Sequence, residues 1–226
     1  MQSFENADKL YELQQHQKGF EELHSRLQEG ERDVEILWRL CRFCNDLAFC
    51  SSGDKKTKII LDGRDYGLQA VEADPTNFEA AKWSAILFGL YVDTLSTKEK
   101  ITEGGKLKEM LDKALEMDPK DHCLLHLRAR FSYTLANLSW LERKAASVLY
   151  SELPKATIED ALNDFEAANN SFPDWIENLL YLSKCYLFKK DKSKAKEHLT
   201  KAVKLPAESV NDKEMMNECK KLLEKC

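Results

Sequence analysis

The sequence contains few residues that interrupt helices and no apolar run long enough to cross a membrane. Only 5 prolines and 8 glycines occur among its 226 residues, and strand-like alternation of apolar and polar residues is scarce. The most apolar segment, residues 83–92, has about half the length that a membrane-spanning helix needs. Residues 1–10 lack the apolar core of a secretory signal peptide. These absences predict a soluble helical protein that is not secreted and has no transmembrane segment or N-terminal membrane anchor.

The sequence also lacks the marks of several functional classes. Its net charge is −5, whereas a general nucleic-acid binder needs a concentrated basic face, so we expect no nucleic-acid partner. Its 7 cysteines are odd in number and scattered, which favours free thiols in the cytoplasm over a disulfide framework. No glycine-rich phosphate loop follows a strand, and no nucleophile adjoins a base in a recognisable motif. We therefore expect a protein that is not an enzyme and uses no cofactor.

Two patterns with metal-like spacing are better explained by packing. Cys41 and Cys44 are three residues apart, but no second pair of cysteines matches them. His122 and His126 lie one helical turn apart, but a third and a fourth ligand are not evident. The sequence thus predicts no metal site.

The stretch from Thr157 to Pro206 has the spacing of a tetratricopeptide repeat. Three residues that share one helical face are followed by a proline that ends the helix: Ala161, Phe165, Ala168 and Pro173. The next segment follows the W-x2-L-G-x2-Y spacing of the motif's first helix with substitutions at two of its four places: Leu179, Leu182, Ser183 and Tyr186. A second helix with small and large residues in alternation then ends at Pro206: Ala195, Leu199 and Ala202.

Similar spacing elsewhere predicts an all-α fold, a tetratricopeptide-like α-solenoid of about four irregular helix pairs. We expect one domain, residues 1–226, that begins with a single N-terminal helix and ends with a helix that caps the stack. The expected ranges are 4–30 for the N-terminal helix, 33–75, 76–119, 120–173 and 174–206 for the repeats, and 211–226 for the capping helix.

Four local features refine this outline. Gly63 and Gly67 stand where larger residues are usual, so the first repeat must pack unusually closely or loosely. Asp93–Gly105 reads as a long link, and Thr134–Lys155 as an insertion with a helical stripe. Asp33 and Asp212 are the expected N-caps of the second and the last helix.

The first helices of such pairs line the inner surface of a solenoid, so the residues just after their packing positions are candidates for binding. These candidates combine cations with apolar or aromatic neighbours, which suits an anionic ligand with some apolar surface. They are Arg39, Phe43, Lys82, Ile86, His126, Arg130, Tyr133, Lys184 and Leu187.

An alternative interpretation is equally compatible with the sequence. The cations could be solvated or paired with nearby carboxylates such as Asp46, Glu79 and Glu177. Two lysine clusters, Lys55–Lys58 and Lys189–Lys196, would lie on the outer surface and could add a salt-sensitive contact to an acidic peptide.

Four segments of the chain resemble the regulator of microtubule dynamics family. They are Asp33-Val-Glu-Ile-Leu-Trp-Arg-Leu, Ala136-Asn-Leu-Ser-Trp-Leu-Glu-Arg-Lys, Ile158-Glu-Asp-Ala-Leu and Ser171-Phe-Pro-Asp-Trp-Ile-Glu-Asn. The resemblance extends from about Leu10 to Pro206, and the chain is similar in size to the compact members. Its most specific part is 136–144, which an ordinary tetratricopeptide repeat does not require.

The resemblance implies a helical repeat domain that associates with microtubules and with the mitotic spindle and its poles, and that affects chromosome segregation. It implies a location in the cytoplasm and on the cytoskeleton. The expected partners are tubulin, through its acidic tails, and acidic peptides of spindle proteins. Because other members carry an N-terminal membrane anchor and their repeat domain can hold a phospholipid, a phospholipid in the same groove is the alternative. In that case Phe43, Ile86, Tyr133 and Leu187 would contact acyl chains, and Arg39, Lys82 and Arg130 the phosphate.

Overall fold

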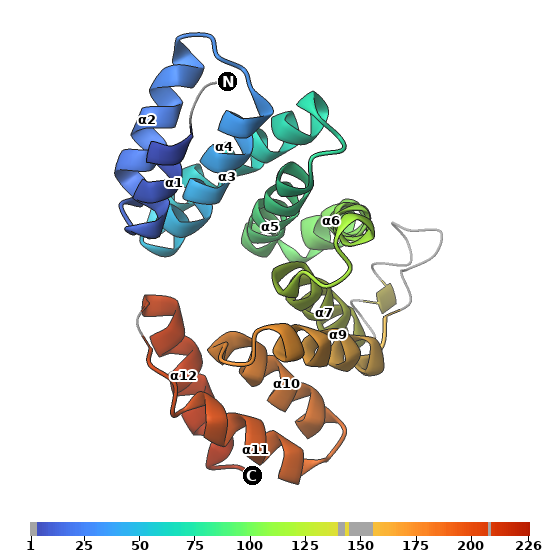
Figure 1. Cartoon of the computed structure of the whole chain (residues 1–226). Coiled ribbons are helices and arrows are strands. Elements are labelled where there is room, and N and C mark those ends of the chain that lie inside the picture. Colours follow the sequence, from blue (N-terminus) through green and yellow to red (C-terminus); the bar gives the residue numbers. More distant parts are fainter. Residues whose placement is uncertain (1–3, 140–142, 145–155, 208) are drawn as a thin grey trace. The chain divides into compact units, whose positions relative to one another are not determined.

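The computed structural model describes residues 4–139, 143–144, 156–207 and 209–226, and within these ranges every regular element is a helix (Figure 1). The prediction of an all-α fold is confirmed. The chain divides into two compact units. The first unit holds the residues up to Glu103 and Asp112–Met117, and the second holds Gly104–Leu111 and Asp118–Cys226. No helix in the described ranges is both long enough and apolar enough to span a bilayer.

The first unit begins with two helices, so the prediction of one N-terminal helix over 4–30 is wrong. Helix α1 covers Glu5–Glu12 and α2 covers His16–Gln28, with Gln14 at a φ of 57° between them. Ala7 and Leu23 are both fully buried in one cluster with residues of the next helix. In a straight helix these two residues would lie about 24 Å apart. The chain must therefore turn between them to bury both.

Helices α3 (Val34–Phe49), α4 (Gly53–Ala73) and α5 (Phe78–Thr94) pack unusually closely. A Cβ atom at Gly67 would lie 2.8 Å from the Cα atom of Ser84 and 3.1 Å from the Sγ atom of Cys41. A Cβ atom at Gly63 would lie 2.6 Å from the Cβ atom of Cys44. Of the two alternatives that the sequence left open, the structure has the close one, because only glycine fits at these crossings.

Helix α6 (Thr97–Met117) includes most of the segment that the sequence analysis assigned to a long link. The expected link at Asp93–Gly105 is therefore largely wrong. Ser96 precedes the helix, and both its backbone N–H and its hydroxyl donate to the Glu99 carboxylate. This Ser-x-x-Glu pattern is a helix-start signal, and it explains why the helix begins before Gly105.

The second unit contains α7 (His122–Ala136), α9 (Ile158–Ser171), α10 (Ile176–Phe188), α11 (Lys192–Ala202) and α12 (Val210–Leu223), drawn from olive to red in Figure 1. The residues with repeat spacing form its core and are almost fully buried: Ala161, Phe165, Ala168, Leu179, Leu182, Ala195, Leu199 and Ala202. The side chain of Thr157 caps α9 in a capping box with Asp160. Most of the predicted insertion at Thr134–Lys155, beyond the end of α7, lies outside the described residues.

Helix caps confirm one expectation and correct another. Asp33 caps α3 by accepting a hydrogen bond from the backbone N–H of Glu35 at 2.9 Å. The N-cap of α12 is Ser209 and not Asp212, which instead stands three residues into the motif and accepts from the Ser209 backbone N–H. Asp212 thus contributes to the same capping box from the other side.

Candidate functional site

Helices α7 and α10 each present three side chains at offsets of zero, four and seven residues, which place them on one helical face. From α7 these are His126, Arg130 and Tyr133, and from α10 they are Glu177, Tyr181 and Lys184. We call these six residues the Tyr181 cluster. Four of the predicted binding residues meet in it: His126, Arg130, Tyr133 and Lys184. Tyr181 was not among the predicted binding residues, although its place between Glu177 and Lys184 on α10 gave the signal.

The carboxylate of Glu177 lies at the centre of the cations. Its Oε1 atom is 3.2 Å from Nη1 of Arg130 and 3.7 Å from Nε2 of His126. Burial by itself would raise the pKa of Glu177, but interactions with His126, Arg130 and Lys184 outweigh it and lower the pKa to about 2. Glu177 is therefore ionised at neutral pH and cancels the charge of Arg130.

The orientation of His126 is set by a buried amide. The Nδ2 atom of Asn178 donates to the backbone carbonyl of Phe165 at 2.9 Å, so its Oδ1 atom faces His126 Nδ1, also at 2.9 Å. Because that oxygen can only accept, Nδ1 of His126 must carry the hydrogen. Nε2 is buried without a hydrogen-bond partner among the described residues and points toward Glu177. His126 is 4% exposed, so it acts as a core residue and not as a ligand-facing one.

The ring of Tyr181 joins the two helices. Its centroid lies 5.6 Å from that of Tyr133 and 5.5 Å from that of Phe165. The guanidinium of Arg130 lies 5.4 Å and the ammonium of Lys184 lies 4.6 Å from the ring centroid, within the range of cation–π attraction.

Lys184 is paired as well. Its Nζ atom lies 2.9 Å from Oε1 of Glu218 on α12. In this unit the structure therefore agrees with the alternative interpretation of the sequence, in which nearby carboxylates neutralise the cations. The cluster fastens α7, α10 and α12 to one another, and it contains no nucleophile activated by a base.

The predicted cation of α3 is also engaged. Arg39 is 8% exposed, and its Nε and Nη2 atoms donate to Asp8 at 3.0 and 2.8 Å. Its Nη1 atom donates to the Glu35 carboxylate at 2.6 Å, and the guanidinium lies 4.1 Å from the ring centroid of Trp38. Arg42 donates to Asp8 too, at 2.7 Å. Burial would raise the pKa of Asp8, but hydrogen bonds from Arg39 and Arg42 lower it. This network attaches α1 to α3, so the prediction that Arg39 faces a ligand is wrong.

The remaining candidates occupy the edge or the interior of the core. Phe43 is fully buried against Gly19, so the expected contact of Phe43 with an acyl chain or a peptide is wrong. Ile86 packs against the buried cluster of Cys41, Cys44 and Leu87, and Leu187 is packed against the core of the second unit. Lys82 is half-buried and lies 5.8 Å from the ring centroid of Trp83. The lipid-binding alternative loses one of its four apolar contacts and stays a prediction.

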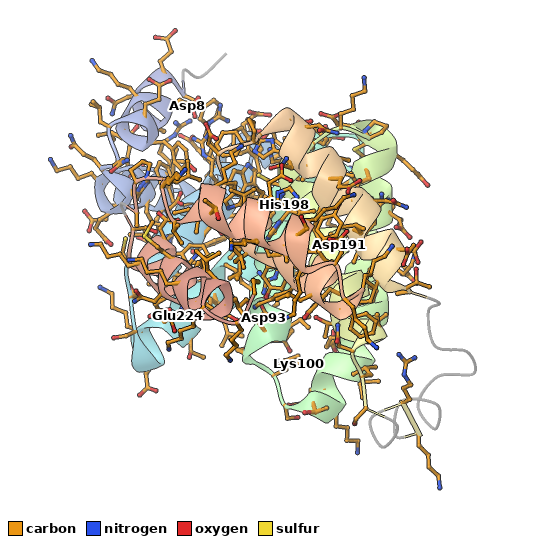
Figure 2. All side chains as sticks on the ribbon, turned by 90° about the horizontal axis from the view of Figure 1, so that it is seen from below. Asp8, Asp93, Lys100, Asp191, His198 and Glu224 are labelled. Atoms are coloured by element: carbon orange, nitrogen blue, oxygen red, sulfur yellow. The ribbon has the colours of Figure 1, made fainter. Side chains whose placement is uncertain are left out.

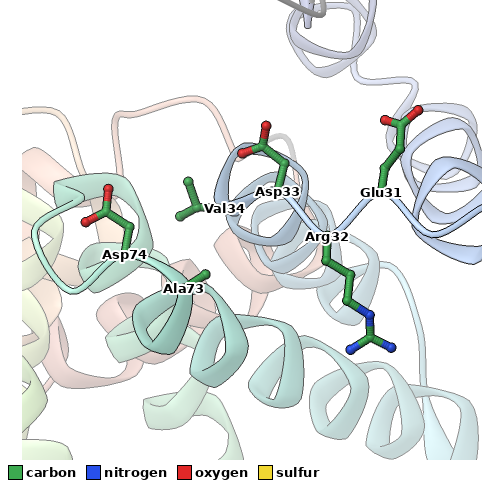
Figure 3. Close-up of a pocket in the computed structure, with 6 residues that line it drawn as sticks. All are labelled: Glu31, Arg32, Asp33, Val34, Ala73 and Asp74. Atoms are coloured by element: carbon green, nitrogen blue, oxygen red, sulfur yellow. The ribbon is translucent and has the colours of Figure 1, made fainter.

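A pocket of about 560 Å³ lies where the ends of α2 and α4 approach the start of α3 (Figure 3). It is lined by Glu31, Arg32, Asp33, Val34, Ala73 and Asp74. Three of its carboxylates already have partners: Asp33 caps α3, Asp74 accepts from the backbone and the hydroxyl of Thr76, and Glu31 pairs with Arg26. The guanidinium of Arg32 points away from the carboxylates of Glu31 and Asp33 (Figure 3). The pocket is a junction of helix ends whose carboxylates are already engaged, so it is a poor candidate for a ligand site.

The densest run of exposed cations lies on α11 and the turn before it. Seven lysines and two acidic residues occur between Lys189 and Lys204, which we call the basic segment. Five of the lysines are exposed within one short stretch: Lys189, Lys190, Lys192, Lys194 and Lys196. The sequence predicted this stretch only as an outer cluster. In Figure 2, Asp191 and His198 mark the helix.

The local contacts compensate only part of this charge, and Lys201 pairs with Asp174 at 3.3 Å. Lys189 pairs with Glu159, Lys192 donates to the backbone carbonyl of Lys225, and Lys194 lies 5.0 Å from the ring centroid of Tyr186. Lys190 and Lys196 form no ion pair with any described residue. Burial lowers the pKa of His198, so its imidazole adds no positive charge at neutral pH. The Asp191 carboxylate is turned to the helix and accepts from the backbone N–H of Lys194.

Comparison with known proteins decides the family. The sequence profile described as Regulator of microtubule dynamics protein 1-3 matches residues 3–226. The chain belongs to the regulator of microtubule dynamics family. It is 62% identical to Regulator of microtubule dynamics protein 1 of Caenorhabditis elegans over 226 residues, which cover all of both chains. It is 36% identical to the protein of that name from Bos taurus over 97% of this chain and 69% of the bovine one.

Solved structures that resemble this family member include a tetratricopeptide protein. A thermophilic protein of this class from Thermus thermophilus matches with a TM-score of 0.65 at 14% identity, over 96% of each chain. The MamA protein matches with a TM-score of 0.54 at 13% identity, over 89% of this chain and 88% of its own. At this level of identity the likeness concerns the fold, and it confirms the tetratricopeptide-like α-solenoid. The family name further supports a role in regulating microtubules.

Proposed function

We propose that this protein is a non-enzymatic microtubule-binding module that acts in the cytoplasm, on the mitotic spindle and at its poles, in spindle organisation and chromosome segregation. The contact is made with the glutamate-rich tails of tubulin. Acidic peptides of spindle proteins would use the same surface, because the attraction is one of charge and is not specific to a sequence.

One observation carries the proposal: six of the seven lysines in the basic segment are exposed, five of them between Lys189 and Lys196, in a chain whose net charge is −5. Lysine is a flexible cation that forms point-charge contacts with a disordered acidic tail without a fixed geometry. The predicted groove supports a smaller share of the contact, because Arg130 and Lys184 already have carboxylate partners within 3.2 and 2.9 Å.

The test is co-pelleting of the full chain with intact microtubules and with microtubules whose acidic tails have been removed by limited proteolysis. We expect removal of the tails to abolish most of the binding at low ionic strength. We also expect binding to intact microtubules to weaken steadily as salt is raised from about 0.05 to 0.3 M, because exposed charges are screened over about 10 Å at 0.1 M.

Equal binding to intact and trimmed microtubules would contradict the proposal. A competition control uses a tubulin-tail peptide and a peptide of scrambled sequence with the same number of glutamates. It separates the effect of charge on binding from the effect of sequence. We expect the scrambled peptide to compete as well as a tubulin-tail peptide, and a neutral glutamine version not to compete.

A further inference from the structure

A single serine lies within the lysines of the basic segment. Ser193 is the second residue of α11, and Lys192 and Lys194 are its direct neighbours. Lys190 and Lys196 lie three residues away on either side. Ser193 is exposed, and its hydroxyl forms no hydrogen bond within the described part of the chain. The other hydroxyl in the segment, that of Thr200, belongs to a residue that is half-buried.

Ser193 is also accessible without any loss of packing. Helix α11 is held to the unit by Ala195, Leu199 and Ala202, which are fully buried. At 100° per residue, Ser193 stands roughly opposite this stripe. A reagent or an enzyme can therefore reach its hydroxyl while the core stays closed.

We propose that Ser193 is a phosphorylation site for a serine kinase that recognises basic residues, and that phosphate there weakens the contact with the acidic partner. The inference rests on the proposed function. In the reaction, Oγ of Ser193 attacks the γ-phosphorus of ATP and the bond to the ADP oxygen breaks. The hydroxyl proton passes to the base of the kinase, and ADP leaves.

The added group changes the segment's charge directly. A phosphoserine carries about −1.5 to −2 charges at pH 7, so it offsets much of the lysine excess around it. The phosphate would repel a glutamate-rich tail and pair with neighbouring lysines such as Lys196. Its place in the first turn of α11 is favourable for an anion, so the helix stays folded and the effect falls on binding.

A comparison within the chain sets Ser193 apart. Thr57 is also surrounded by lysines, namely Lys55, Lys56 and Lys58. Its hydroxyl, however, donates to the backbone carbonyl of Gly53 at 3.4 Å inside α4. We therefore expect a basophilic kinase to label Ser193 in preference to Thr57.

The first experiment incubates the full chain with the catalytic domain of a basophilic serine kinase and ATP, and maps the modified residues by mass spectrometry. We expect phosphate at Ser193 and, in Ser193→Ala, a loss of at least about half of the incorporation. Unchanged incorporation in Ser193→Ala, or no phosphate on the peptide that contains Ser193, would overturn the site.

The second experiment places phosphoserine at position 193 by genetic encoding and measures the affinity for microtubules with intact tails. We expect binding about tenfold weaker at low ionic strength, and a smaller difference at high salt. The matched control carries phosphoserine at position 25, an exposed serine of α2 outside the basic segment, and should bind like the unmodified protein. Far-UV circular dichroism should show that both proteins are equally helical.

Equal affinity with and without phosphate at Ser193, or an equal loss with phosphate at Ser25, would overturn the regulatory effect. The failure of the proposed function is a different result: the unmodified protein would then bind tail-trimmed microtubules as well as intact ones. In that case the proposed effect of phosphate on microtubule binding is contradicted together with the proposed function. Whether a kinase labels Ser193 is then decided by the first experiment alone.

Discussion

Helix α3 in the first unit carries two arginines and helix α11 in the second carries four lysines, and the two helices use these cations differently. On α3, Arg39 and Arg42 are fixed by Asp8 and stacked on aromatic rings. On α11, the lysines project from an exposed face and few of them have a carboxylate partner among the described residues. A planar guanidinium matches a carboxylate at two points and suits a fixed internal contact, whereas an ammonium on a flexible stem suits a mobile partner. Positive charge in this fold thus serves cohesion on α3, whereas on α11 it stays exposed, where we propose that it serves recognition.

The two units also differ in how closely their helices cross. Gly63 and Gly67 of α4 leave no room for a Cβ atom. In the second unit, Ala195 and Ala202 of α11 occupy the corresponding stripe, and both are fully buried with their methyl groups in the core. The first unit therefore tolerates less change at its crossings.

The largest effect on stability is expected from Glu177→Gln, which removes the carboxylate of the Tyr181 cluster. The pKa of Glu177 is about 2 in the folded chain and 4.5 ordinarily, so its ionised form stabilises the fold above pH 4.5, and this contribution is lost as the pH falls toward 2. We expect Glu177→Gln to lower the free energy of unfolding at pH 7 by about 3 kcal/mol, measured by urea denaturation.

The same measurement repeated between pH 5 and pH 2 sharpens this prediction. The difference between the wild type and Glu177→Gln should shrink across that range, since the wild type then loses the same charge by protonation. A difference that stays constant over this range would show that Glu177 acts by packing and not by charge.

Gly67→Ala is expected to destabilise the first unit. The new Cβ atom would meet backbone, 2.8 Å from the Cα atom of Ser84, and overpacking of this kind costs about 1–3 kcal/mol. The higher helix propensity of alanine returns about 1 kcal/mol, so we expect a net loss of up to about 2 kcal/mol in thermal or urea unfolding. Gly104→Ala on α6 is the control: its nearest neighbour is the ring edge of Phe131 at 3.3 Å, and it should be neutral or slightly stabilising. Equal losses of stability from Gly67→Ala and Gly104→Ala would contradict the closer packing of helices that we assign to the first unit.

Asp8→Asn weakens the network that attaches α1 to α3. We expect a loss of about 1 kcal/mol, below the value for a buried ion pair, because the Asp8 side chain is 37% exposed and Arg39 keeps Glu35 as a partner. Asp65→Asn, which breaks the exposed pair with Arg64, should change the stability by less than about 0.5 kcal/mol. The ratio of the stability losses of Asp8→Asn and Asp65→Asn in urea titrations measures how much the attachment of α1 depends on the contact between Asp8 and Arg39.

The smallest effect on stability is expected from removal of the exposed lysines. A variant that combines four substitutions should change the free energy of unfolding by less than about 0.5 kcal/mol, because no buried group loses a partner. The substitutions are Lys190→Gln, Lys192→Gln, Lys194→Gln and Lys196→Gln. A loss of several kcal/mol in denaturant titrations would mean that these lysines hold the fold together like the arginines of α3.

The sequence predicted the helix pairs well because their signal is local. The spacing of Ala161, Phe165 and Ala168, and of Ala195, Leu199 and Ala202, is set by the helical period, and all six residues are buried. The break at Gln14 was missed because no residue near it disfavours a helix. It follows from the burial of both Ala7 and Leu23, which is a property of the packed unit.

The binding residues were less predictable because their partners are remote in the chain. Arg39 meets Asp8 across 31 residues and Arg128 meets Asp164 across 36, distances at which spacing carries no signal. The sequence could name the cations on the inner faces of the helices, but it could not say that Arg130 would be neutralised by Glu177. The clustering of lysines around α11 needed no such partner and was visible in the sequence itself.

The most direct test compares two variants in microtubule co-pelleting at low ionic strength. One replaces the exposed cations of α11, Lys190, Lys192, Lys194 and Lys196, with glutamine. The other replaces the paired cations, Arg130 and Lys184, with glutamine. We predict that the first variant binds at least about tenfold more weakly and loses most of its salt dependence, while the second, with its helicity verified, binds within about twofold of the wild type. Retained binding in the first variant together with lost binding in the second would contradict the assignment of recognition to the basic segment.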